Sequence, residues 1–351
     1  MSVSFCADCP SGQNELLIGT APTVQCFVMI ECPPPWGKTI DQAKYLPDTL
    51  RTMIADPQYA RRGIRFYLIK GDSTTDRRRP RLVIFQRPQG FTAGYRAYEL
   101  RLHDLNEAAV QLAQYFASRS LPPKAEQLST RDIFICTHGQ YDACCSRYGY
   151  PFYRQAQQYL QTHLQNDRPN NRQAPAAPVR LWQISHIGGH RFAPTLLTLP
   201  DGRYYGRLTL ETFRLLLQSH VQRPDQLSEE LPGQWRSLLA TYRGWSLLPG
   251  PLQILEHSFW RNQGWFWLDQ QIRYQILQGG TNQAQWQVLF AYRSPSGGRQ
   301  SWWATVVEDA HQTVMASCGD TAPTQIAKFR IAALRSLSPN VSLGKQGLGV
   351  R

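Results

Sequence analysis

The sequence predicts an α/β protein, with a central unit flanked by an N-terminal α/β unit and a C-terminal α+β unit. Short strand-like apolar runs alternate with helical patterns as far as residue 222, and from Arg223 onward two helical stretches precede two strand-like runs. The 351 residues are 42% hydrophobic and 11% aromatic, which is enough apolar material for cores in two or three domains. We therefore place the units at residues 1–121, 122–222 and 223–351.

The N-terminal unit begins with a buried strand at residues 24–31, which ends at a turn containing three consecutive prolines. The later elements are strand-like runs at residues 64–69, 81–85 and 95–102 and a helical pattern at residues 106–119. Pro122 and Pro123 end this unit, because proline interrupts a helix.

The central unit has the element order βαβ followed by ββα, which is the order of a thioredoxin fold. Its elements are strands at residues 132–135, 179–185, 195–199 and 204–208 and helices at residues 151–165 and 210–221. Residues 193–202 resemble the segment of thioredoxins in which a cis proline opens the strand beside the active site. We therefore expect a cis peptide bond before Pro194.

The C-terminal unit is expected to contain helices at residues 235–242 and 252–260 and strands at residues 285–292 and 302–308. Its tryptophans Trp245, Trp260, Trp265 and Trp267 are expected to pack in the core, because each indole buries a large apolar area.

The residues that carry chemistry lie at the ends of two strands of the central unit. Cys136 ends one strand and Cys145 follows nine positions later, while His186 ends the next strand and His190 follows four positions later. The glycine pair at 188–189 disfavours a helix between the histidines. A loop is therefore expected here, and a loop can bring both imidazoles to one metal.

Two thiolates and two imidazoles suit either zinc or a [2Fe–2S] cluster in which the cysteines hold one iron and the histidines hold the other. Zinc sites usually place their first two cysteines about two to four residues apart, so the wide spacing between Cys136 and Cys145 favours the cluster. A metalloprotease is disfavoured, because the histidine pair lacks the helix and the adjacent glutamate of that motif.

At these residues the chain resembles the sucrase/ferredoxin-like family of thioredoxin-like ferredoxins. The residues that carry the resemblance are Cys136-Thr137-His138-Gly139, Asp142, Cys144-Cys145 and residues 186–194. Related thioredoxin-like ferredoxins hold their cluster with four cysteines, and His186 and His190 match the last two. The resemblance implies a bis-histidine [2Fe–2S] cluster bound by Cys136, Cys145, His186 and His190. Glycoside hydrolysis is not implied, because no paired-carboxylate motif supports it.

Four further residues adjoin the predicted ligands: Cys144, His138, Arg191 and Pro194. Cys144 is expected to be a neighbour of the cluster, and it stays an alternative to Cys145 as the second thiolate. His138 is expected to occupy a turn or to contact a ligand. For Arg191 three roles stay open, namely offsetting the charge of the cluster, facing an anionic partner, or being solvated.

The other cysteines carry weaker signals. Cys6 and Cys9 have the spacing of redox-active dithiols, but no strand precedes them, so a mobile N-terminal tail is expected. Cys26, Cys32 and Cys318 are expected to be packing residues. A second metal site formed by Cys6, Cys9 and Cys32 is the disfavoured alternative, because no fourth ligand is evident.

The net charge of +13 suits an anionic partner, and residues 51–101 alone contain 12 basic and four acidic residues. We expect this region to dock an acidic redox protein, and an ordinary solvated basic surface stays open as the alternative. Nucleic-acid binding is disfavoured, because no recognised motif surrounds the arginines. No apolar run approaches the roughly 20 residues that cross a bilayer, which argues against membrane insertion. Sparse cysteines and the absence of a secretory signal predict a cytoplasmic protein.

These observations together predict a one-electron carrier whose electron uptake is coupled to a proton, because imidazole ligands can gain or lose one. The sequence leaves open whether the acceptor is a protein or a small oxidant, and only the second would make the protein an enzyme. The alternative is a zinc-stabilised structural or interaction protein that uses the same four ligands.

Overall fold

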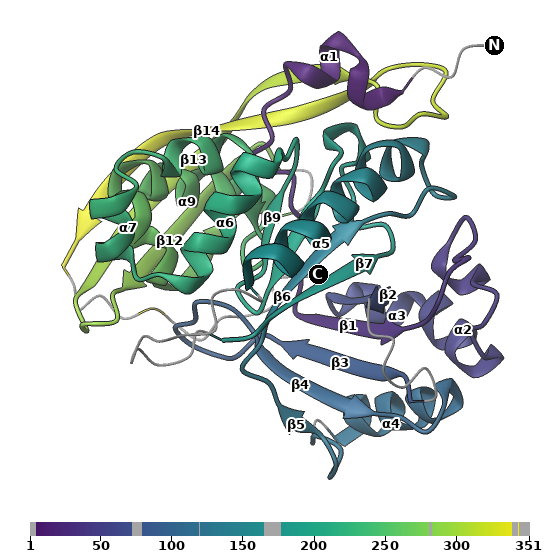
Figure 1. Cartoon of the computed structure of the whole chain (residues 1–351). Helices are drawn as coiled ribbons and strands as arrows, with labels where there is room; N and C mark the ends of the chain where they lie inside the picture. The colour runs from purple at the N-terminus through teal and green to yellow at the C-terminus, as the bar shows by residue number, and fades with distance from the viewer. Residues whose placement is uncertain are drawn as a thin grey trace.

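The computed structural model of the chain describes residues 5–71, 79–118, 120–164, 177–280, 283–338 and 343. It contains a ten-stranded mixed sheet flanked by helices and a separate four-stranded antiparallel sheet (Figure 1). The predicted α/β class is therefore confirmed. No helix in these described ranges is long and apolar enough to cross a membrane.

The first half of the large sheet follows the predicted order of strands. Its strands are β1 (Cys26–Glu31), β2 (Ile64–Gly71), β3 (Arg81–Gln86), β4 (Arg96–Arg101) and the short β5 (Glu126–Gln127). Helix α4 (Leu105–Ser118) matches the predicted helix, whereas α2 (Asp48–Ala55) and α3 (Pro57–Arg61) were not expected. β1 and β2 are parallel, β3 is antiparallel to β1, and β4 is antiparallel to β3.

The second half repeats this arrangement. Its elements are β6 (Arg131–Cys136), α5 (Tyr150–Leu164), β7 (Val179–Ile184), β8 (Leu196–Leu199), β9 (Arg203–Tyr205) and α6 (Leu210–Val221). β6 and β7 are parallel, β8 is antiparallel to β6, and β9 is antiparallel to β8. This is the βαβ and ββα arrangement expected from the sequence, and the peptide bond before Pro194 is cis as predicted. The last strand is shorter than the predicted residues 204–208.

The two halves meet at an antiparallel pair between the ends of β2 and β7, where Ile69 lies opposite Ile184. One sheet therefore continues across residue 121, at which the sequence suggested a boundary. This junction also brings together the loops that follow β1 and β6. Nε2 of His138 in the second loop donates to the carbonyl oxygen of Gly37 in the first at 2.7 Å. The chain thus uses one topology twice and places corresponding loops side by side.

The remaining strands complete both sheets, and three more α-helices accompany them. They are α7 (Pro224–Glu230), α8 (Trp235–Ala240), β10 (Tyr242–Trp245), α9 (Gly250–Gln263), β11 (Gln271–Gln278), β12 (Gln285–Arg293), β13 (Arg299–Val314) and β14 (Thr324–Leu337). The predicted helix at residues 235–242 extended too far, because Tyr242 begins a strand that pairs with β9 at the edge of the large sheet. β11 to β14 form the four-stranded sheet in sequential order.

Burial explains why the sheet is central. Strand β1 is buried on both faces, with Val28 and Ile30 facing one apolar cluster and Phe27 and Met29 facing another. The second of these clusters includes residues from all three predicted units, among them the four tryptophans expected to be core. Trp245, Trp260, Trp265 and Trp267 are each at most 1% exposed, so the packing prediction is confirmed.

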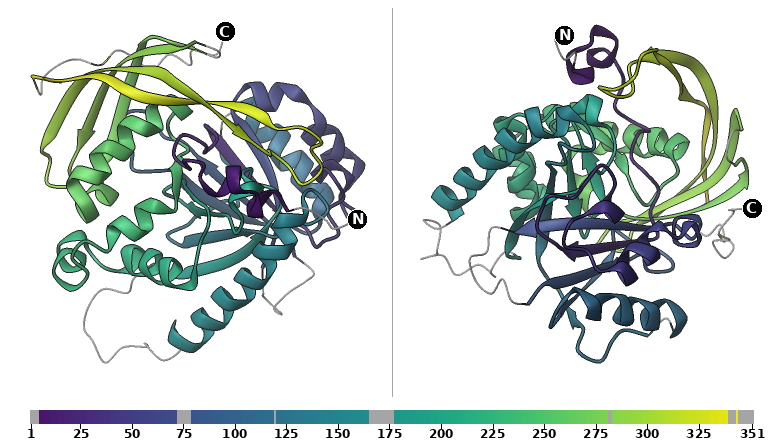
Figure 2. Two further views of the ribbon diagram at one scale, coloured as in Figure 1. Left: turned by 90° about the horizontal axis from the view of Figure 1, so that it is seen from above. Right: turned by 90° about the vertical axis from the view of Figure 1, so that its right-hand side faces the viewer.

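One hairpin of the small sheet extends far from the rest of it. Strands β13 and β14 run together until Val314 pairs with Thr324, and the segment between them forms the tip. This hairpin crosses the N-terminal segment, which contains the short helices η1 (Cys6–Asp8) and α1 (Pro10–Gln13) (Figure 2). Residues from opposite ends of the chain thereby reach the loop that follows β6.

Candidate metal centre

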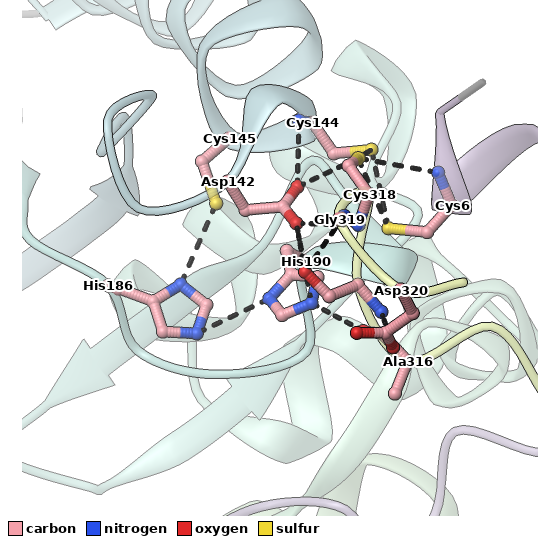
Figure 3. Close-up of polar contacts among 11 residues, drawn as sticks. Cys6, Asp142, Cys144, Cys145, His186, His190, Ala316, Cys318, Gly319 and Asp320 are labelled. Atoms are coloured by element: carbon pink, nitrogen blue, oxygen red, sulfur yellow. Dashed lines mark hydrogen bonds and ion pairs between the residues drawn. The ribbon is translucent and has the colours of Figure 1, made fainter. Parts of the chain in front are cut away.

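Four predicted ligands converge at the ends of β6 and β7. Ligand atoms of Cys136, Cys145 and His186 all lie within 4.8 Å of one another. Sγ of Cys145 is 3.7 Å from Nδ1 of His186, and Nε2 of His186 is 3.4 Å from Nδ1 of His190 (Figure 3). We call Cys136, Cys145, His186 and His190 the cluster group. The ligand atoms of Cys136, Cys145 and His186 lie together, whereas His190 is outside that set and adjoins it through its contact with Nε2 of His186.

The loop between the histidines depends on its two glycines. Gly188 and Gly189 have φ values of 81° and 72°, in the left-handed region that other residues adopt only with strain. A Cβ at Gly189 would also lie 2.5 Å from the guanidinium of Arg243. The predicted loop is confirmed, and its left-handed turn brings His190 back beside His186.

His138 holds the start of this loop. Its Nδ1 accepts a hydrogen bond from the backbone N–H of His186 at 3.2 Å, while its Nε2 donates to Gly37. Burial lowers the pKa of His138, so the ring stays neutral and can accept at one nitrogen and donate at the other. His138 therefore orients His186 through the backbone and connects the two halves of the sheet.

The thiols of the cluster group lie at the end of β6 and in the turn that leads into α5. A π-helical turn at Cys145–Gly149 leads into this helix, and a Cβ at Gly149 would lie 2.0 Å from the carbonyl oxygen of Cys136. Glycine therefore lets the turn approach the end of β6. Interaction with Cys145, and then with His186, lowers the pKa of Cys136 well below the usual thiol value, whereas the pKa of Cys145 is raised. A proton held by Cys145 thus stabilises a thiolate at Cys136.

One side of the cluster group opens toward solvent at His186. Cys136 and Cys145 are 1% exposed and His190 is 9% exposed, whereas His186 is half-buried. The ring of Tyr141 stacks on His186 with centroids 3.8 Å apart and an interplanar angle of 11°. Both rings line a cleft of about 480 Å³, whose other lining residues include Arg65, Gly188, Gly189, Arg191 and Arg243.

The tip of the β13–β14 hairpin covers the opposite side. Nε2 of His190 donates to the carbonyl oxygen of Ala316 and lies 3.6 Å from Oδ2 of Asp142. Burial lowers the pKa of His190, so the neutral ring is favoured despite the nearby carboxylate. Since Nε2 of His190 contacts the hairpin, its Nδ1 is the nitrogen that faces His186, 3.4 Å from Nε2 of that ring.

A second group of sulfurs lies beside the first. Sγ of Cys144 points away from the cluster group, 3.5 Å from Sγ of Cys6 and 3.2 Å from Sγ of Cys318. Oδ1 of Asp142 accepts hydrogen bonds from the backbone N–H of Cys144 at 2.9 Å and from the thiol of Cys318 at 3.1 Å. We call Cys6, Asp142, Cys144 and Cys318 the thiol group.

The thiol group corrects two expectations and bears on a third. Cys6 is 1% exposed and held within the protein, so the N-terminal segment from residue 5 is not a mobile tail. Cys318 is not simply a packing residue, because its sulfur faces two other thiols and a carboxylate. The direction of the Cys144 side chain leaves Cys145 as the thiol that faces His186. No sequence signal linked Cys6 to Cys318, which lies 312 positions later.

The remaining predicted neighbours have defined places. Arg191 forms a bidentate ion pair with Glu15, at 2.5 and 2.8 Å, and its side chain is 12% exposed. It is therefore not solvated, and its charge is matched by a residue of the N-terminal segment. Pro194 lies two residues before the start of β8, which pairs with β6 beside the cluster group.

Comparison with known families bears on this site. The family model described as sucrase/ferredoxin-like matches residues 17–237, more than half of the chain. The chain belongs to the sucrase/ferredoxin-like family. Searches of curated proteins and of solved structures found no match. The region matched by the sucrase/ferredoxin-like model contains the whole cluster group, whereas Cys6 and Cys318 of the thiol group lie outside it.

The donor set of this sucrase/ferredoxin-like protein suits a metal. Two thiols and two imidazole nitrogens are soft and borderline ligands of the kind that bind zinc or iron, and they lack the oxygen donors that magnesium or calcium prefer. The backbone N–H of His186 donates to the ring of His138, and Nε2 of His190 donates to the carbonyl oxygen of Ala316. Such outer contacts commonly position metal ligands. The cluster group is therefore a candidate metal centre with preorganised ligands.

Proposed function

We propose that this protein transfers single electrons through a [2Fe–2S] cluster held by Cys136, Cys145, His186 and His190. The observation that supports the proposal is the convergence of two thiols and two imidazoles at the ends of β6 and β7, in a member of a ferredoxin-like family. Such a cluster, when bound, accepts and returns one electron, and imidazole ligands raise its potential above that of a site with four cysteines.

The two histidines have different roles in proton exchange. His190 is buried and its Nε2 contacts Ala316. His186 is half-buried and lines the cleft, so protons from solvent reach this ring more readily. An added electron favours an added proton on an imidazole ligand, because the proton offsets the negative charge. Electron uptake is therefore coupled to proton uptake, with His186 as the more accessible ring.

The cleft also suggests where electrons enter or leave. Arg65 is exposed at its rim, in the region where the sequence has its excess of basic residues. Arg77 and Arg78 of that region lie outside the described residues. Positive charge beside a half-buried ligand favours encounter with an acidic redox protein or an anionic oxidant. Docking at this cleft is part of the proposal, and a cytoplasmic location stays a prediction.

Zinc is the second candidate for the cluster group. Ligand atoms of Cys136, Cys145 and His186 that all lie within 4.8 Å of one another also suit a single tetrahedral ion. In that case the four ligands would stabilise the ends of β6 and β7, and the protein would have a structural or interaction role.

One experiment separates these candidates. The full chain is purified without oxygen, its visible and EPR spectra are recorded before and after dithionite, and iron and zinc are quantified on the same sample. We expect about two irons per chain, a visible band that bleaches, and an EPR signal in the reduced state. Colourless protein whose four cluster ligands hold zinc would contradict electron transfer and support the structural role.

Histidine substitutions test the proton coupling. His186→Cys and His190→Cys should each lower the reduction potential and weaken its dependence on pH, because a thiolate replaces a neutral ligand that can bind a proton. His103→Cys is the matched control, since its side chain is 90% exposed and among the described residues it forms an ion pair with Asp104 alone. Potentials are measured by spectroscopic titration between pH 6 and 9. An unchanged pH slope in both site variants would rule out coupling through these rings.

A further inference from the structure

Beyond the cluster group, the thiol group has the composition of a metal site. Its three sulfurs are 3.2, 3.5 and 3.6 Å apart, and Oδ1 of Asp142 is 3.1 Å from Sγ of Cys318 (Figure 3). They come from η1, the loop before the π-helical turn, and the tip of the β13–β14 hairpin. Segments this distant in sequence have placed four potential ligand atoms together.

The distances suit one ion better than a disulfide. A tetrahedral zinc with Zn–S bonds of about 2.3 Å holds its sulfurs roughly 3.8 Å apart, so small side-chain adjustments would accommodate it. A disulfide would join only two of the sulfurs and would leave the third thiol and the carboxylate unused. A single ion uses all four groups.

Charge and burial lead to the same conclusion. Cys6, Cys144 and Asp142 are at most 4% exposed. Within the part of the chain that the structure describes, no lysine or arginine forms an ion pair with Asp142, and the basic side chain nearest its carboxylate is the imidazole of His190, with Nε2 3.6 Å from Oδ2. A buried carboxylate among thiols is costly without a compensating positive charge. A divalent cation supplies that charge and releases the thiol protons.

We propose that Cys6, Cys144, Cys318 and Asp142 bind a zinc ion. The ion would fasten η1 and the hairpin tip to the loop that carries Cys145. It would thereby hold Ala316 against His190 and keep the covered side of the cluster group closed. This site is independent of the identity of the metal in the cluster group, and Cys6 and Cys318 lie outside the residues matched by the family model.

The test measures zinc and iron by mass spectrometry in the full chain and three variants. Cys6→Ser and Cys318→Ser should each lose about one zinc per chain and keep their iron, because each removes one thiolate from the thiol group alone. Cys9→Ser is the matched control, since Cys9 follows η1 and its sulfur contacts the carbonyl oxygen of Phe5, outside the group. If zinc also fills the cluster group, the same variants should fall from two zinc ions to one, so the two proposals remain separable.

Cobalt gives a readout that does not depend on variant folding. Co²⁺ added to zinc-depleted wild-type chain should produce thiolate charge-transfer bands and the visible bands of a tetrahedral site, with a stoichiometry of about one for this site. Wild-type protein without zinc or cobalt binding, zinc retained in Cys318→Ser, or a disulfide between two of the three cysteines in anaerobic protein would each overturn the proposal.

Discussion

The cluster group and the thiol group are neighbours built in different ways. The cluster group comes entirely from two strand ends of one half of the large sheet, within residues 136–190. The thiol group takes one cysteine from each end of the chain and two ligands from the loop after β6. Two adjacent cysteines contribute to different groups. Cys145 faces His186, whereas Cys144 faces Cys6 and Cys318.

This difference shows how one loop can serve two sites. The carboxylate of Asp142 touches both, accepting from Cys318 and lying 3.6 Å from Nε2 of His190. Burial alone would raise the pKa of Asp142, but the hydrogen bonds that the carboxylate accepts from the backbone N–H and the thiol of Cys318 lower it below its usual value. The anionic carboxylate can therefore accept from the hairpin and contact the ring. The cluster group opens on a cleft, whereas the hairpin closes over the thiol group.

Replacing each of the adjacent cysteines by serine should have the largest effect on metal content. Cys145→Ser should lose nearly all iron, at least tenfold, because it removes a ligand of the cluster group. Cys144→Ser should keep its iron and lose zinc instead. Both are measured as metal per chain together with visible absorbance.

The two variants control each other, since each changes one sulfur to oxygen at adjacent positions of the same loop. If both variants lost iron equally, Cys144 and Cys145 would not belong to separate metal sites. Circular dichroism establishes that each variant is folded.

A smaller effect is expected on the stability of the fold at acid pH, where protonation of His220 acts separately from proton coupling at the cluster group. Burial lowers the pKa of His220, near the end of α6, to about 4, and its Nε2 has no hydrogen-bond partner among the described residues. Unfolding frees this ring to bind a proton at its ordinary pKa near 6.5. Its contribution to stability is therefore present above that pKa and is lost as the pH falls toward 4.

Urea unfolding measures this loss. Between pH 7 and pH 4.5 the wild-type free energy of unfolding should fall by about 2 kcal/mol more than that of His220→Gln, which cannot gain the proton. Equal losses in both proteins would show that His220 does not set the acid sensitivity. In either protein the pH dependence of the reduction potential should be the same, because His220 belongs to neither group.

The smallest effect tests the open side of the cluster group. Arg65→Glu should slow oxidation of the reduced protein by anionic ferricyanide about threefold to tenfold at low salt and speed oxidation by cationic hexaammineruthenium, because it reverses a charge at the cleft. Stopped-flow absorbance gives both rates. Arg96→Glu, the same change at an exposed position on β4, should leave them nearly unchanged. Equal effects of the two substitutions would place electron exchange elsewhere, and zinc content should not respond to either.

Much of the fold was predictable because it depends on local patterns. Apolar runs identified β1, β3, β6 and β7, and the periodicity of apolar residues identified α4 and α6. The helix predicted through Tyr242 was wrong because pairing with β9 outweighed the local pattern. The repeated topology was also missed, since it lies in the order and direction of strands and not in a repeated string of residues.

The four residues of the cluster group could be selected from the sequence, because Cys136 and His186 follow consecutive strands and a short loop holds each to its partner. Neighbouring parallel strands bring such ends to one edge of a sheet whatever surrounds them. The thiol group, the contact of Ala316 with His190 and the hydrogen bond from the backbone of His186 to the ring of His138 could be found only from the folded chain. These contacts depend on the path of a long hairpin and of the N-terminal segment. Packing between residues far apart in the sequence fixes both paths, so no local motif or residue spacing predicts the contacts.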